Sequence, residues 1–194
     1  LPMVAFALPA GLVHHWNFDE GPDWHDSAFL SVYAGTATVD RVGMLDATLR
    51  NMAASNWVSG RQFTGLDFDG LDDHLTVTGN LAVTLGDTAS LSCWLRTTAT
   101  GAASSASAPG LAGVAGGGIQ WAWLDDGGRI ALAVDGVPVV HSGDAVNDGE
   151  WHHVVLTRDA GTGVAQVFVD GALSQTATGA AGAKATTFSS LGRI

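Results

Sequence analysis

Two histidine pairs are the side chains in this sequence that most resemble metal ligands. They are His14–His15, which precede a tryptophan, and His152–His153, which follow one. Neutral imidazole is a common metal ligand, but neighbouring side chains of a strand point to opposite faces, so neither pair can hold one ion from a regular strand. One histidine from each pair could still meet across adjacent strands. We interpret both pairs as strand residues that add amphipathic bulk at a sheet surface.

Aspartates gather around a glycine turn in the segment DFDGLDD, which spans residues 67–73. Hard cations such as calcium prefer oxygen ligands, and Asp69 and Asp72 would supply them here. The segment lacks the ligand spacing and the closing glutamate of an EF-hand loop. Two interpretations stay open: one structural calcium ion, or an aspartate-rich turn that holds no ion.

Carboxylates that could hydrolyse a glycoside are scarce. The chain has two glutamates, Glu20 and Glu150, and both fall where a strand should meet a turn. Retaining glycosidases need two carboxyl groups about 5–5.5 Å apart. Asp67 and Asp69 come closest to a pair on one strand face, but they stand at a strand end. We therefore predict no catalytic residues and expect that the protein is not an enzyme.

Tryptophans offer a second kind of site, because sugars stack on exposed aromatic rings. In the segment IQWAWLDD, Trp121 and Trp123 stand two residues apart, which places both on one face of a strand. They are the candidate ligand-binding residues, in a strip on which a sugar would stack, but packing between two sheets is the interpretation that we favour for them. Three further tryptophans, Trp24, Trp57 and Trp94, are also available.

Short runs with period-two hydrophobicity must position these residues. In the run SLSCWLR, Leu91, Cys93 and Leu95 alternate with Ser92, Trp94 and Arg96, and similar runs lie at 73–78, 128–134 and 164–171. Asp-Gly or Gly-Gly pairs, which favour turns, stand at 69–70, 127–128, 135–136, 148–149 and 170–171. This pattern predicts an all-β, two-sheet antiparallel sandwich with no helix longer than about three turns.

The charge of the chain restricts its partners. Nineteen acidic residues against eight basic ones give a formal net charge of −11, which disfavours nucleic acid and anionic membrane surfaces. Cations and neutral glycans remain compatible with such a surface. The single cysteine, Cys93, lies in an apolar strand-like run and is expected to be a small buried residue. No apolar stretch is long enough for a transmembrane helix.

Four segments together resemble the laminin G-like jelly-roll domains of the concanavalin A-like lectin/glucanase superfamily. They are GLVHHWNFDEG, LDFDGLDDHLTV, SLSCWLRT and GEWHHVVLTRDAGTGVAQVFVDGAL, in the order that the family has them. The resemblance covers about residues 11–194, which we take as one domain. It implies two stacked curved sheets whose concave face many relatives use for glycans, and an extracellular recognition or adhesion module that binds a glycan or a protein.

The same resemblance bears on the two chemical sites. Glucanases of the superfamily carry paired glutamates on one strand, a motif that this sequence lacks. In jelly-roll relatives a structural calcium often ties the first strand to a glycine-containing loop. Transferred to this chain, that site would combine Asp19 or Glu20 with Asp69 and Asp72.

The two ends of the sequence depart from the family pattern. Residues 1–10, LPMVAFALPA, look like the end of a secretory signal without its basic region. The last strand of the family would follow the segment FSSLGRI and is absent, which predicts an unpaired sheet edge that invites strand addition. The alternative function is therefore a structural subunit that forms a filament or oligomer by donating an N-terminal strand, with Met3, Val4, Phe6 and Leu8 as its assembly residues. A third reading is that the sequence is a piece of a longer protein.

Overall fold

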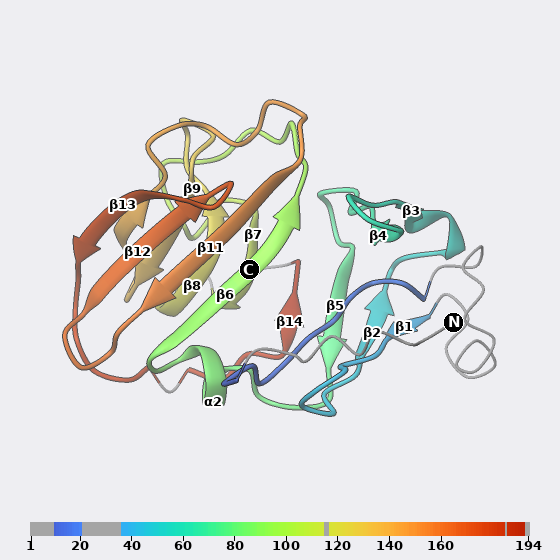
Figure 1. The fold of residues 1–194 in the computed structure, drawn as a ribbon, viewed down its shortest axis with the longest axis horizontal. Helices are drawn as coiled ribbons and strands as arrows, with labels where there is room; N and C mark the ends of the chain where they lie inside the picture. Colours follow the sequence, from blue (N-terminus) through green and yellow to red (C-terminus); the bar gives the residue numbers. More distant parts are fainter. Residues whose placement is uncertain (1–9, 21–35, 115–116, 185, 193–194) are drawn as a thin grey trace.

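The computed structural model describes residues 10–20, 36–114, 117–184 and 186–192, and its strands form two main antiparallel sheets (Figure 1). The larger sheet has eight strands in the order β1-β2-β5-β14-β7-β8-β9-β10. Their bounds are β1 Ala37–Thr38, β2 Ala47–Arg50, β5 His74–Val77, β14 Ser190–Leu191, β7 Gly110–Val114, β8 Gly117–Leu124, β9 Ile130–Val134 and β10 Val137–His141.

The smaller main sheet has the strand order β13-β12-β11-β6. Its strands are β13 Ala172–Thr178, β12 Val164–Val169, β11 His152–Arg158 and β6 Ala89–Leu95. A separate hairpin joins β3 Trp57–Ser59 to β4 Thr64–Leu66, and the helical turns are η1 Ala54–Asn56 and α2 Ala82–Leu85. The predicted all-β sandwich is confirmed, and neither of these helical elements exceeds four residues.

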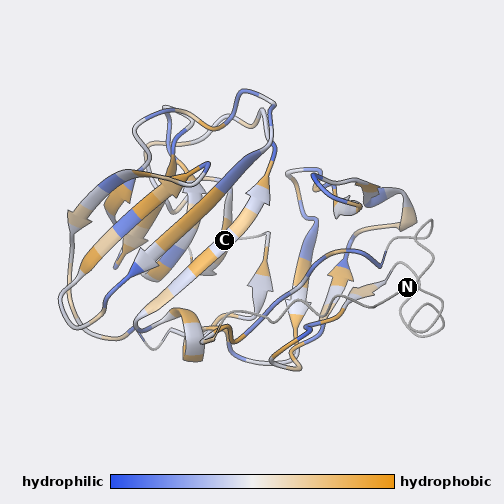
Figure 2. Cartoon of the chain, in the orientation of Figure 1, coloured by the Kyte–Doolittle hydropathy of each residue, from blue (hydrophilic) through white to orange (hydrophobic). Residues whose placement is uncertain are grey.

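Alternation of side chains builds the core between the two sheets. In β11, Val154 and Leu156 are fully buried while Val155 and Thr157, which point the other way, are only partly covered. Figure 2 shows this alternation as bands of hydrophobic and hydrophilic residues along the strands. The buried face of β11 meets Trp121 and Leu132 of the larger sheet in one hydrophobic cluster. Burial of that apolar face is the main force that holds the two sheets together.

Tight turns connect the strands where the sequence predicts them. The glycine at the second position of each of the five predicted turn pairs has a positive φ angle. At 135–136 and 170–171 the aspartate also has a positive φ, of 53° and 51°. Two residues with positive φ make the tight turn that fits the twist of a two-residue hairpin, here β9–β10 and β12–β13.

The predicted first strand is not a regular strand. Between residues 12 and 20 the chain forms one isolated bridge, from Trp16 to Asp40, and Phe18 has a φ of 57° that interrupts an extended conformation. The interpretation of His14 and His15 as residues of a strand is therefore wrong. Both lie in an irregular segment against the larger sheet.

One edge of the smaller sheet is open. Among the described residues β6 pairs with β11 on one side and with no strand on the other. Its inward side chains Leu91, Cys93 and Leu95 pack against the core but are only partly buried. In Figure 1, strands β5, β2 and β1 extend beyond this edge. The predicted assembly residues Met3, Val4, Phe6 and Leu8 lie outside the described residues, as does Trp24.

Candidate functional site

Trp121 and Trp123 do not form the candidate stacking strip. The pairing of β8 with β9 shifts register between them, and Ala122 there has a φ of 55°, so a bulge turns the two rings to opposite faces. Trp121 is fully buried between the sheets, where its indole Nε1 donates to the carbonyl of Leu85. Trp123 lies on the other face, covered by Ala102 and Ala108. Neither ring is exposed for stacking.

Trp94 is the one tryptophan among the described residues that is well exposed, with 47% of its surface accessible. It lies on the outer face of β6, opposite His153 of β11. The two rings are tilted at 38° with centroids 5.1 Å apart. The period-two pattern of residues 90–96 already separated Trp94 from the inward side chains, so the signal for its exposure was present in the sequence.

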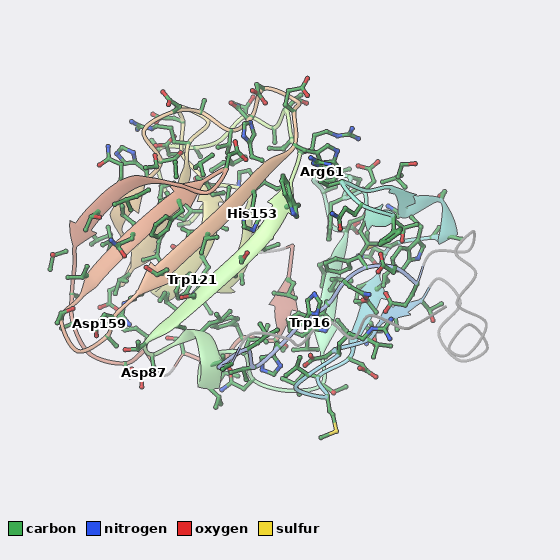
Figure 3. The ribbon with its side chains drawn as sticks, viewed as in Figure 1. Trp16, Arg61, Asp87, Trp121, His153 and Asp159 are labelled. Atoms are coloured by element: carbon green, nitrogen blue, oxygen red, sulfur yellow. The ribbon has the colours of Figure 1, made fainter. Side chains whose placement is uncertain are left out.

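Two arginines complete an aromatic strip on this face, which we define as Arg61, Trp94, Arg96, Trp151 and His153. The guanidinium carbon of Arg61, from the β3–β4 turn, lies 5.1 Å from the centroid of Trp94. That of Arg96 lies 5.1 Å from the centroid of Trp151. Figure 3 shows Arg61 and His153 at the same end of β6. Cations at this distance from an aromatic face are held by the ring quadrupole.

Uncharged polar groups surround the aromatic strip. Ser92 Oγ lies 2.9 Å from Nε2 of His153, within hydrogen-bond distance. Beyond it the outer face of the sheet carries Thr157 and Gln166, which face each other across β11 and β12. The amide of Gln166 in turn donates to the hydroxyl of Thr176 on β13. The arrangement combines a stacking surface with hydrogen-bonding groups and has no carboxylate within the strip itself.

His152 points to the opposite face from His153, as predicted for neighbours in a strand, and it joins two aspartates. Its Nδ1 lies 2.8 Å from Asp170 Oδ2 and its Nε2 lies 3.1 Å from Asp148 Oδ1. The hydrogen bond to Asp170 is the main cause that raises the pKa of His152. Because the ring nitrogens face carboxylates, this histidine links the 143–150 loop to the β12–β13 turn.

The other histidine pair, His14 and His15, makes hydrogen bonds with an aspartate and is not arranged around an ion site. His14 Nδ1 lies 2.7 Å from Asp40 Oδ2, and the His15 amide donates to the second carboxylate oxygen. Asp40 also accepts from the amides of Val42 and Gly43. These hydrogen bonds outweigh its burial and hold the pKa of Asp40 well below its usual range.

The acidic loop brings together only part of the predicted calcium set. Oxygens of Asp69, Asp72 and Asp73 lie within 4.8 Å of one another, the only such carboxylate, histidine or cysteine group found among the described residues. Asp69 Oδ1 accepts from the Leu71 amide at 2.8 Å, and this bond is the main cause that lowers the pKa of Asp69. Buried Asp73 accepts from Asn56.

Asp19 and Glu20 lie outside that group, which corrects the predicted combination. Glu20 is buried and accepts from Thr38 Oγ1 at 2.9 Å and from Arg41 at 3.3 Å. Asp19 accepts from Asn17. The reason is local: Glu20 has its own hydroxyl and guanidinium partners beside β1. Any ion in the loop would have Asp69, Asp72 and Asp73 as its protein carboxylates.

Glu20, Glu150 and Cys93 lie apart from one another and do not form a common site. Glu150 is an exposed residue in the turn before β11, and Glu20 is held beside β1. Cys93 faces the core from β6, where burial raises the pKa of its thiol to about 12. A thiol in that state is a poor nucleophile at neutral pH.

Comparison with known proteins identifies the family to which the chain belongs. No helix within the described residues is long and apolar enough to cross a membrane. A search of curated proteins finds no match to the chain. A laminin G family model, described as the concanavalin A-like lectin/glucanases superfamily, matches residues 68–193, which include the whole of the smaller sheet and every strand of the larger sheet except β1 and β2. The chain belongs to the concanavalin A-like lectin/glucanases superfamily.

Proposed function

We propose that the chain is a non-catalytic, secreted recognition module that binds a neutral glycan on the outer face of the four-stranded sheet. The observation that carries the proposal is the exposed ring of Trp94, whose centroid lies 5.1 Å from the guanidinium carbon of Arg61 and 5.1 Å from the ring centroid of His153. Domains of this superfamily commonly bind ligands, which supports recognition as the role. The site differs from the Trp121–Trp123 strip that the sequence suggested.

The chemistry of the aromatic strip suits a sugar chain. The apolar face of a sugar ring can stack on Trp94, while Ser92, His153 and Arg61 offer hydrogen bonds to its hydroxyl groups. Farther along the face, Thr157 and Gln166 would meet the next residues of an extended chain. The net charge of −11 repels polyanions at long range, so a neutral glycan is favoured over an acidic one.

Affinity electrophoresis in gels that contain soluble neutral polysaccharides tests this proposal. A suitable set is laminarin, xyloglucan, galactomannan and arabinoxylan. We expect retardation by at least one of them, with the affinity of Trp94→Ala reduced by about tenfold or more. Val137→Ala is the matched control, because Val137 is an exposed apolar residue of the other sheet. Equal retardation of Trp94→Ala and the wild type would contradict a site on this face.

A second candidate function is assembly by strand addition, and the open edge of β6 favours it. This edge has seven residues without a charge, a proline or a bulge, the features with which sheet edges usually avoid pairing. A strand from a neighbouring copy could cover Leu91, Cys93 and Leu95 there. The donor suggested by the sequence is the segment with Met3, Val4, Phe6 and Leu8.

A further inference from the structure

A cavity of about 220 Å³ lies on the face of the eight-stranded sheet that is turned away from the four-stranded sheet. Trp123 of β8, Ala131 of β9 and Pro138 of β10 line it, together with Ala103 of the covering loop. These side chains form apolar walls. Its polar lining comes from the β8–β9 turn and the end of β10, namely Asp125, Asp126, Arg129 and His141.

The charges in this cavity do not cancel. Nε of Arg129 donates a hydrogen bond to Oδ2 of Asp125 at 2.8 Å, and Nη2 of Arg129 lies 2.7 Å from the same oxygen. Asp125 is buried, and its other oxygen accepts from the backbone amides of Gly127 and Arg129. Arg129 is therefore neutralised by Asp125. Asp126 is exposed and makes no ion pair or hydrogen bond with a described residue, but its charge helps the hydrogen bond to Asp125 to raise the pKa of Arg129. Two carboxylates beside one guanidinium leave a net charge of −1 in this part of the lining.

His141 adds an acceptor to the same lining. Its Nδ1 lies 2.8 Å from the carbonyl oxygen of Ser142. A carbonyl can only accept, so Nδ1 carries the proton and the neutral ring has a lone pair at Nε2. Nε1 of Trp123, which is a donor, is buried and has no hydrogen-bond partner among the described residues. The cavity thus combines apolar walls with acceptors and a net negative charge.

From this lining we infer that the cavity binds a primary ammonium group on a short alkyl chain. The ammonium, with its three donors, would meet the carboxylate of Asp126 and Nε2 of His141, and the alkyl chain would lie against Ala131 and Pro138. The net charge of −11 draws cations toward the surface. The ligand can be a free amine or the side chain of a lysine, because both present the same group.

Titration of the full chain with butylammonium, followed by the indole ¹H–¹⁵N resonance of Trp123, tests the site. We expect a saturable shift with butylammonium and none with butan-1-ol, which has nearly the same shape without the charge. Asp126→Asn should weaken the affinity at least tenfold. Asp87→Asn removes the same charge from an exposed position outside the cavity lining and should leave the affinity within twofold of the wild type.

A second variant tests the cavity itself. Ala103 is exposed at the rim, so Ala103→Phe should fill the mouth and abolish the shift without disturbing the core. Nα-acetyl-lysine N-methylamide distinguishes a lysine side chain from a free amine as the ligand. If this compound binds, the site is assigned to lysine side chains. If only butylammonium binds, the site is assigned to free amines. No saturable shift with either amine, an equal response to butan-1-ol, or an equal loss in Asp87→Asn would overturn the inference.

Discussion

A histidine whose two ring nitrogens both face carboxylates can donate to both only when it is protonated. His152 has this geometry, between Asp148 and Asp170, and its pKa is raised. The stabilisation that it provides is complete below the pKa of the unfolded chain, near 6.5, and is lost as the pH rises through the folded pKa. The lowered pKa values of both aspartates add stability above about pH 4, which is lost on acidification.

We therefore predict that His152→Gln lowers the melting temperature by about 2 °C near pH 5.5 and by less at pH 9. The effect is small because both aspartates are half-exposed to solvent. Calorimetry of both proteins from pH 5 to 9 measures it. A difference in melting temperature that does not change with pH would show that the ion pairs contribute nothing.

The acidic loop gives a second prediction at this scale, that of a calcium ion held by Asp69, Asp72 and Asp73. An ion that binds only the folded chain raises the melting temperature by linkage, by several degrees at saturation. Asp72→Asn should remove this rise, while Asp144→Asn, an exposed aspartate of another loop, should keep it. Equal melting temperatures of the wild type in calcium and in chelator would argue against an ion.

Hydrolysis of β-glucans should be undetectable by reducing-sugar assay on laminarin. The physical reason is that Glu20 is bound to Thr38 and Arg41, while Glu150 is exposed in a turn. Reducing ends released by the wild type but not by Glu150→Gln would instead assign a catalytic role to this glutamate.

Backbone conformation decides stability at glycines with a positive φ, whether they lie in a turn, as Gly171 does, or within a strand, as Gly113 does in β7. Gly171 has a φ of 82° and open space around a Cβ, so Gly171→Ala should cost only the strain of a left-handed residue, about 1 kcal/mol. Gly113 has a φ of 137° and a Cβ there would lie 2.3 Å from the carbonyl oxygen of Ile119. Gly113→Ala should cost about 3 kcal/mol or more.

Urea unfolding of both variants measures these costs. Gly117→Ala is the control, because that glycine has neither a left-handed φ nor a neighbour within 4 Å of a Cβ. It should change the free energy of unfolding by less than about 0.5 kcal/mol. Equal losses at Gly171 and Gly113 would mean that the larger sheet relaxes around the added methyl group.

The elements that the sequence predicted well are those set by local rules. Period two placed Trp94 outside and Cys93 inside, and the Asp-Gly pairs marked the hairpins. The bulge that separates Trp121 from Trp123 could not be predicted, because Ala122 is neither glycine nor asparagine and nothing local requires its positive φ. Tertiary packing against both faces of β8 overrides the alternation there.

The aromatic strip was missed for another reason. Its Arg61 comes from the β3–β4 turn and its His153 from β11, and only the folded chain brings them to Trp94. The misassigned Glu20 has a similar explanation, since its partner Arg41 is distant in the sequence. Long-range contacts of this kind leave no periodic signal.

At the scale of the whole molecule, the open edge of β6 predicts the behaviour of a truncated chain. If residues 1–10 fill that edge in a neighbouring copy, the full chain should form oligomers or filaments, and a chain without them should be a monomer. Size-exclusion chromatography with light scattering compares the two. Identical masses, or residues 3–8 packed within their own chain, would exclude strand donation.

The position of β14 in the larger sheet has a consequence for how the protein is made. This strand pairs Ser190 with Thr76 of β5 and Leu191 with Ala112 of β7, so it stands between strands that are synthesised far earlier. A ribosome must synthesise the chain beyond Leu191 before β14 can join β5 to β7. Until then each presents a bare edge, and pairings between such distant segments form slowly. The nascent chain should therefore depend on chaperones until β14 has left the exit tunnel.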